Sequence, residues 1–217
     1  MADSGRSRRQ FLFSASVTGS GLALLGFSKE DKKENISPTE DLMREHGILR
    51  RIMLIYREAI RRIEAHQDFP PAVLSNSANL VLRFVHDYHE KLEEEQIFPR
   101  FKKARLLVDL VNTLYEQHQK GRVLTQSILK LSSSMNRDYL QLFIRTYEPH
   151  TAREDTVLFP AFHNIISERE LKALGDYFEK TEDKLFGARG FEKNVDDVAA
   201  MEKALGIYDL AQFTPRV

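Results

Sequence analysis

HEKLEEEQIFPRF at residues 89–101 and HTAREDTVLFPAF at residues 150–162 are two copies of one pattern, offset by 61 residues. Both read His-x-x-x-Glu-acidic-x-x-apolar-Phe-Pro-x-Phe. Positions i and i+4 of a helix share a face, so each copy directs an imidazole and a carboxylate toward one point. Two such faces that meet across a helical bundle would form a nitrogen-and-oxygen site for two iron or manganese ions.

Composition excludes several other kinds of site. The chain has 217 residues and no cysteine, which rules out disulfides, iron–sulfur clusters, thiolate zinc sites, cysteine nucleophiles and a lipoprotein anchor on cysteine. Lys plus Arg and Asp plus Glu both total 32, and no basic stripe stands out. We therefore expect no nucleic-acid partner. The length fits one domain with accessory segments.

The N-terminal segment differs in character from the rest of the chain. Ser7–Leu12 reads SRRQFL and resembles a twin-arginine export signal, followed by an apolar, small-residue-rich run over Phe13–Phe27. That run is shorter than the roughly 20 apolar residues of a membrane span. We predict a signal over residues 1–28, the twin-arginine translocase as a partner during export, and a periplasmic or exported protein; the alternative is a basic N-terminus before a weak helix. Because twin-arginine substrates typically cross the membrane folded, this route suits a protein that receives its metal in the cytoplasm.

Residues 29–39 read as a linker, and beyond them the apolar spacing is helical, with no sustained alternation typical of strands. The spacing predicts four long amphipathic helices over Thr39–Ala65, Ala72–Lys102, Leu106–Ser132 and Asn136–Ile166. Short polar connectors between long helices favour an all-α, up-down four-helix bundle, here over residues 40–166. We expect Pro99 and Pro160 to kink or end their helices below the site.

Residues 167–217 are predicted to form a helical extension outside the bundle. Ser167 and Glu170 have the spacing of a capping box and predict a helix that runs to about Leu185. A further short helix is expected over Glu192–Leu205. No catalytic residue is evident in this extension.

Each predicted bundle helix carries one histidine on its inward seam: His46, His89, His118 and His150. Glu93 and Glu154 lie one turn beyond the second and the fourth of these. A single inward histidine is more often a satisfied core residue, but buried imidazoles and carboxylates together need a compensating charge. A pair of metal ions provides it, so we predict these six residues as metal ligands.

Neighbouring residues are assigned supporting roles. Tyr115 and Tyr147 each lie three residues before an inward histidine and are predicted to hydrogen-bond a ligand or a bound oxygen species. His86, one turn before His89, either supports the site or lies at the edge of the bundle. Acidic runs usually face water, so Glu94 and Glu95 are assigned to solvent.

These residues resemble the hemerythrin-like (HHE) domain over about residues 40–165. The resemblance implies a four-helix bundle that holds a non-haem di-iron centre, with manganese as an alternative metal. The family's ligand positions correspond to His46, His89, Glu93, His118, His150 and Glu154. A ferritin-like site is discounted, because no histidine here has a glutamate three residues before it.

Three departures bear on function. Arg122 occupies the position of the second helix-three histidine of oxygen-carrying hemerythrins. The fourth-helix carboxylate is Glu154, four residues after His150, whereas those proteins have an aspartate five residues after the histidine; Asp155 stands at that position here and is a competing ligand. Glu90 matches a ligating carboxylate of an iron sensor, which makes it an additional candidate ligand. A shell rich in carboxylates favours higher oxidation states, which disfavours plain reversible oxygen carriage. We expect an exported di-iron protein that binds or reacts with O2, peroxide or NO. The alternatives are a non-enzymatic iron or oxygen sensor that signals through its C-terminal helices, and a metal-free bundle. No oligomeric state is predicted.

Overall fold

The computed structural model describes residues 36–130 and 137–215, and over these residues the regular elements are all helical. The predicted all-α bundle with extra C-terminal helices is confirmed. The predicted export signal, residues 29–35 of the predicted linker and the predicted connector between the third and fourth helices lie outside the described residues. Within the described residues, no helix is long and apolar enough to span a bilayer.

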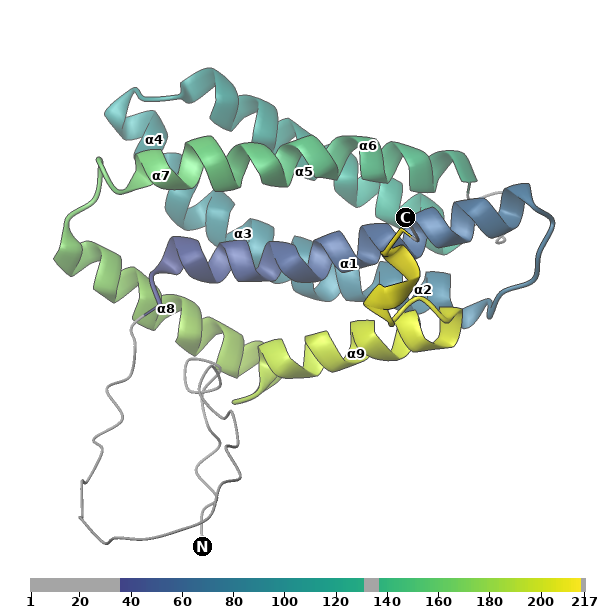
Figure 1. Cartoon of the computed structure of the whole chain (residues 1–217). Helices are drawn as coiled ribbons and strands as arrows, with labels where there is room; N and C mark the ends of the chain where they lie inside the picture. The colour runs from purple at the N-terminus through teal and green to yellow at the C-terminus, as the bar shows by residue number, and fades with distance from the viewer. Residues whose placement is uncertain (1–35, 131–136, 216–217) are drawn as a thin grey trace, which may run out of the picture.

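Four rods form the bundle (Figure 1). The first is α1 (Pro38–Glu64) and the third is α5 (Val108–Lys130). The second rod is a continuous run of α2 (Ala72–Leu80), η2 (Val81–His89), α3 (Glu90–Leu92), η3 (Glu93–Ile97) and α4 (Phe98–Ala104). The fourth consists of α6 (Arg137–Arg153), η5 (Glu154–Leu158) and α7 (Phe159–Phe162). Helix α1 packs on α6, α6 on α5, α5 on α2 and α2 on α1, so the rods enclose one shared core.

The start of α1 shows how local sequence fixes one of these rods. The Ser37 hydroxyl accepts a hydrogen bond from the Glu40 backbone, and the Glu40 side chain accepts one from the Ser37 backbone. This capping box satisfies two amide groups that the first helical turn leaves unpaired, and Pro38 suits the first helical position. The inner face of α1 then buries apolar side chains at helical spacing, among them Leu42, Leu49, Ile52, Met53 and Tyr56.

Pro99 and Pro160 were expected to kink or end their helices, and neither proline ends its helix. Each helix continues, and a wider π turn precedes each proline. The Phe98 amide donates to the Glu93 carbonyl and the Phe159 amide to the Glu154 carbonyl, five residues back in both cases. Because proline has no amide hydrogen, it leaves one carbonyl of the preceding turn without a helical donor, which favours the wider turn.

The C-terminal extension packs along the outside of the bundle. Helices α8 (Glu168–Phe186) and α9 (Gly190–Leu205) are followed by a short 3-10 turn, η6 (Leu210–Phe213). The predicted capping box of Ser167 and Glu170 is confirmed. Helix α9 lies against α1 and α2, and α8 against α1 (Figure 1). The extension buries apolar side chains in the same core as the bundle, namely Leu174, Phe178, Val198, Met201 and Leu205.

Candidate metal centre

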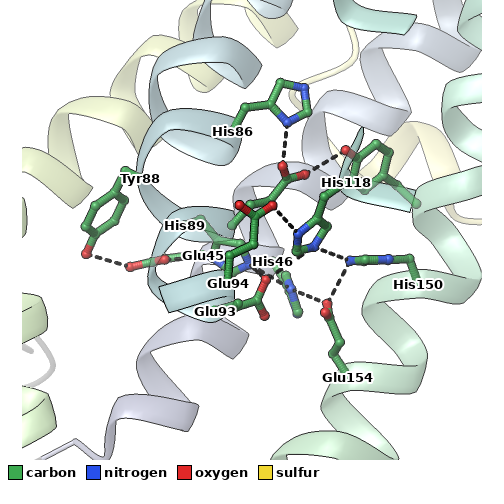
Figure 2. Close-up of polar contacts among 12 residues, drawn as sticks. Glu45, His46, His86, Tyr88, His89, Glu93, Glu94, His118, His150 and Glu154 are labelled. Carbon is green, nitrogen blue, oxygen red and sulfur yellow. Dashed lines mark hydrogen bonds and ion pairs between the residues drawn. The ribbon is translucent and has the colours of Figure 1, made fainter. Parts of the chain in front are cut away.

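The structure brings the six predicted ligand residues together on the axis of the bundle, each at most 3% exposed. His46 comes from α1, His118 from α5 and His150 from α6. His89 ends η2, which is itself a π segment, while Glu93 and Glu154 begin the π turns η3 and η5, so each of these two turns starts at one of the carboxylates. Figure 2 shows these side chains pointing toward one another from all four rods. π turns recur at functional sites because they change the direction of a helical side chain.

The cluster divides into two halves. The Nε2 atoms of His46 and His89 lie 3.1 Å apart, and those of His118 and His150 lie 3.2 Å apart. With one carboxylate each, the halves form two groups whose candidate ligand atoms all lie within 4.8 Å of one another: His46, His89 and Glu93, and His118, His150 and Glu154.

Each carboxylate reaches both halves. The Glu154 Oε2 atom lies 3.1 Å from His150 Nε2 and 3.3 Å from His46 Nε2. The Glu93 Oε2 atom lies 3.5 Å from His118 Nε2 and 3.7 Å from His89 Nε2. If metal ions were bound here, the two glutamates could each contribute oxygen atoms to both halves, and the four imidazoles would supply the nitrogen ligands.

The outer nitrogen of every cluster histidine has its own acceptor. In each case the acceptor faces the Nδ1–H group of the ring. The pairs are His46 with Asp155 at 2.7 Å, His89 with Glu45 at 2.8 Å, His118 with Glu94 at 3.0 Å and His150 with Gln117 at 2.9 Å. These acceptors favour the tautomer with the proton on Nδ1, which leaves the Nε2 lone pair facing the centre. Such outer acceptors orient and strengthen the imidazoles of metal sites.

The geometry and the donor set fit two divalent or trivalent cations. Within residues 36–130 and 137–215, no well-oriented hydrogen-bond donor faces the four carboxylate oxygens of Glu93 and Glu154, although all four are buried. Two inward Nε2 atoms about 3 Å apart need either a shared proton or a cation between them, because two lone pairs at that distance repel each other. Two nitrogen ligands about 2.1 Å from one ion and at a right angle to each other lie about 3.0 Å apart, close to both Nε2 separations. Imidazole and carboxylate ligands together suit iron and manganese.

The cluster perturbs the pKa values of its own members. Burial, followed by repulsion from Glu154, raises the pKa of Glu93 well above its ordinary value. Burial has the same effect on Glu154, but the charge of His150 and the close polar contacts of the His150 and His46 rings outweigh it and lower that pKa. Burial likewise opposes a charge on His46, but Asp155 and Glu154 outweigh it and raise the pKa to about 9. The cluster thus holds protons when it binds no metal ion.

A hydrogen-bonded network flanks the His118–His150 half. Glu90, the additional candidate ligand, accepts a hydrogen bond from the Tyr147 hydroxyl at 2.7 Å, forms an ion pair with Arg122 at 3.0 Å, and lies 2.9 Å from His86 Nδ1. His86 Nε2 lies 2.9 Å from the Thr125 hydroxyl. His86 and Tyr147 therefore lie beside the centre and contact it through Glu90. Burial opposes ionisation of Glu90, but the charges of His118, His86 and Arg122 outweigh it and lower its pKa to about 2.

The predictions for Tyr115 and Glu94 are wrong. Tyr115 is 44% exposed and lies under the Lys102 ammonium, 5.7 Å from its ring centre, so it does not reach the cluster. Both tyrosines lie three residues before a cluster histidine, but Tyr147 faces the inside of the bundle, whereas Tyr115 lies on the outer side of α5. Glu94, which was assigned to solvent, instead accepts from His118 and pairs with Arg122 at 2.8 Å.

Two acceptors were missed from the sequence, Glu45 and Gln117. Each immediately precedes the inward histidine of its own helix and contacts the histidine of the next rod. A polar residue directly before an inward histidine is the signal that marks them. Asp155, considered above as a competing ligand, instead contacts the outer nitrogen of His46 and the Arg50 guanidinium.

Phenylalanines close the cluster on the side of the Phe-Pro motifs. Phe98 stacks on His118 with ring centres 5.4 Å apart, and Phe159 stacks on His46 at 5.8 Å. Phe101 and Phe162, the last residues of the two motifs, contact each other with ring centres 5.9 Å apart. These aromatic contacts keep water from this end of the centre.

Comparisons with known proteins agree with this geometry. The family model described as hemerythrin HHE cation binding domain matches residues 37–162. An uncharacterized protein of Mycobacterium bovis and uncharacterized proteins of two Mycobacterium tuberculosis strains are each 47% identical over 190 residues, which cover 83% of this chain and 74% of each relative. No solved structure matches the chain.

Proposed function

Because this chain belongs to the hemerythrin HHE cation-binding domain family, we propose that it is a non-haem di-iron protein that binds or reacts with O2, peroxide or NO. The supporting observation is the convergence of four imidazole Nε2 atoms and two carboxylates in a buried centre, where each carboxylate lies close to both pairs of imidazoles. When bound, two iron ions supply open coordination positions and two electrons to a small oxidant. Manganese is the alternative metal.

The residues around the centre define what it can accept. Burial and the nearby Glu90 raise the pKa of the Tyr147 hydroxyl, so this group stays protonated and donates a hydrogen bond to the Glu90 carboxylate. This pair places a proton donor beside His150, because the rings of Tyr147 and His150 lie 5.4 Å apart. Phe98 and Phe159 cover the opposite side. A diatomic molecule or a peroxide suits so enclosed a centre better than a larger substrate.

Anaerobic reconstitution with ferrous iron tests this proposal. We expect two iron ions per chain by elemental analysis and a new near-ultraviolet or visible absorption band when oxygen, peroxide or NO is added. Reversal of the band on removal of oxygen would indicate binding, whereas loss of added peroxide over many turnovers would indicate an enzyme. His89→Ala and His150→Ala should lose iron, whereas His66→Ala, on an exposed turn, should keep it. Full-length protein that takes up no iron would contradict the proposal.

The proposed location follows from the N-terminal sequence. We propose that SRRQFL at residues 7–12 directs export of the folded protein by the twin-arginine route. A reporter that is active only after this export, fused to residues 1–39, should be exported in a bacterial host. Replacement of both Arg8 and Arg9 by lysine should abolish export. Export that persists in the double variant would contradict the proposed route.

A sensor is the second candidate, and one observation favours it. Helix α1 carries His46 into the centre and packs its outer face against α8 and α9, so one rod contacts both the metal centre and the extension. In a sensor, loading with iron would change the amide exchange of α8 and α9. Identical exchange in the metal-free and iron-loaded proteins would argue against this candidate.

A further inference from the structure

The contacts of the centre repeat between the two halves of the bundle. His46 and Arg50 of α1 correspond to His118 and Arg122 of α5, each 72 residues later. His89, Glu93 and Glu94 of the second rod correspond to His150, Glu154 and Asp155 of the fourth, each 61 residues later. The contacts correspond as well: Arg122 pairs with Glu94, which accepts from His118, and Arg50 pairs with Asp155, which accepts from His46.

One pair of acceptors breaks this correspondence. Glu45 precedes His46 and accepts from His89, whereas Gln117 precedes His118 and accepts from His150. Glu45 is 2% exposed and also accepts from the Tyr88 hydroxyl at 3.2 Å. The carboxylate that supports His89 is thus replaced by a neutral amide at His150.

The difference in charge has a direct consequence for metal binding. A carboxylate that accepts from Nδ1–H raises the basicity of the inner nitrogen, and an amide oxygen does so less. In the His46–His89 half, both imidazoles have carboxylate acceptors, Asp155 and Glu45. In the other half, His118 has the Glu94 carboxylate as its acceptor, whereas His150 has the Gln117 amide.

We propose that the two metal positions hold their ions unequally. The His46–His89 position retains its ion longer, the His118–His150 position releases its ion first, and the pair Glu45 and Gln117 sets this order. This inference rests on the proposed binding of two metal ions.

Glu90 does not reverse this order. It lies on the flank of His118 and could add a carboxylate to that position. Its Oε1 already accepts from Tyr147, and its Oε2 lies against both Arg122 and His86. In the corresponding place of the other half stands Thr151, which is buried and carries no charge. The flank of the His118–His150 position is therefore polar but already paired.

A chelator challenge tests the order. The full chain is loaded with two ferrous ions without oxygen and mixed with an excess of a coloured ferrous chelator, and iron release is followed by absorbance. We expect two phases of equal amplitude, with rates that differ about tenfold or more. Gln117→Glu should slow the fast phase about tenfold, whereas Glu45→Gln and Asp155→Asn should each accelerate the slow phase.

Gln119→Glu is the matched control, because it adds the same charge to an exposed position of the same helix, and it should change neither phase. Release of both ions in one phase from the unmodified chain would overturn the inference. An unchanged fast phase in folded Gln117→Glu would do the same, as would a slow phase that Glu45→Gln leaves unchanged. Failure of the chain to load any iron would count against the proposed function instead.

Discussion

At Gly121, the packing beside the centre leaves no room for a side chain. A Cβ atom at this position would lie 1.8 Å from the Tyr147 hydroxyl oxygen and 2.6 Å from the ring carbon that carries it. The absent side chain lets the Tyr147 ring pass over α5 and reach Glu90. A glycine in the middle of a 23-residue helix costs helix stability, and here this contact accounts for it.

We expect Gly121→Ala to destabilise the protein by about 1–3 kcal/mol, since the tyrosine must leave its place. Tyr147→Phe removes the closest atom and should recover part of that loss when the two are combined. Urea unfolding of the two single variants and the double variant measures this coupling. Strictly additive effects would show that the two side chains do not compete for one space.

The charges of the centre predict an unusual pH dependence. In the folded, metal-free protein the pKa of His46 is about 9, that of His118 is also raised by Glu90, Glu94 and Glu154 despite burial, and burial raises that of Glu93. All three groups bind protons more tightly in the folded state than in the unfolded state. Their stabilisation is complete below the unfolded pKa values and is lost as pH rises through the folded values.

Metal-free protein should therefore lose stability, on the order of 1–3 kcal/mol, between pH 6.5 and pH 9. Iron-loaded protein should behave differently, because protons compete with metal ions for the same nitrogens and oxygens. The difference in Tm between the two forms should widen with pH. Calorimetric scans of both forms at several pH values measure it, and a constant difference would contradict these assignments.

Four of the candidate ligands, His89, Glu93, His150 and Glu154, could be predicted from spacing within a single helix, whereas His46 and His118 were predicted from their inward positions on the helices opposite. An imidazole and a carboxylate four residues apart share a face whatever surrounds them. The acceptors Glu45, Glu94 and Gln117 could not be assigned in the same way, because each contacts a histidine of another rod. Tyr115 shows the same limit: spacing alone placed it at the site, but the angle between α5 and its neighbours turns it outward.

At the scale of helices, the sequence predicted the rods but not their π turns. The predicted start of the second rod at Ala72 and the predicted end of the last helix at Leu205 agree with the structure. The wide turns after Glu93 and Glu154 were not predicted, since apolar periodicity averages over a whole helix. The repeated Phe-Pro after each ligand glutamate is the local signal for them.

Removal of the two prolines should separate helix stability from metal binding. In the variant with Pro99→Ala and Pro160→Ala, both turns can regain ordinary i to i−4 hydrogen bonds. We expect the metal-free form to gain stability, on the order of 1 kcal/mol, because each helix gains a backbone donor. Iron affinity should fall, since the normal turn would rotate Glu93 and Glu154 away from the bridging position. Unchanged iron affinity would show that the π turns do not set the ligand geometry.

At the scale of the whole molecule, the extension lies beyond the family match but is part of the same core. The match ends at residue 162, whereas α9 packs on α1 and α2. The Arg51 guanidinium donates two hydrogen bonds to the Glu202 carboxylate, at 2.9 and 2.5 Å, and Arg62 donates to the Leu205 carbonyl at 2.6 Å. Sequence periodicity predicted these helices, but their contact with α1 could not be predicted, because it depends on which outer face of the bundle is apolar.

Glu202→Gln tests whether the extension is a separate unit of stability. Glu202 is 5% exposed, so loss of its charge should cost about 1–3 kcal/mol and leave Arg51 without a charged partner. Amides of α8 and α9 should then exchange hydrogen faster, while those of α5 and α6 keep their protection. Asp197→Asn breaks an exposed pair between the same helix and Arg83 and should change exchange little. Equal loss of protection in α5 and α9 would instead mean that the bundle and the extension unfold as one unit. Metal binding could then change amide exchange in the extension only by changing the stability of the whole protein.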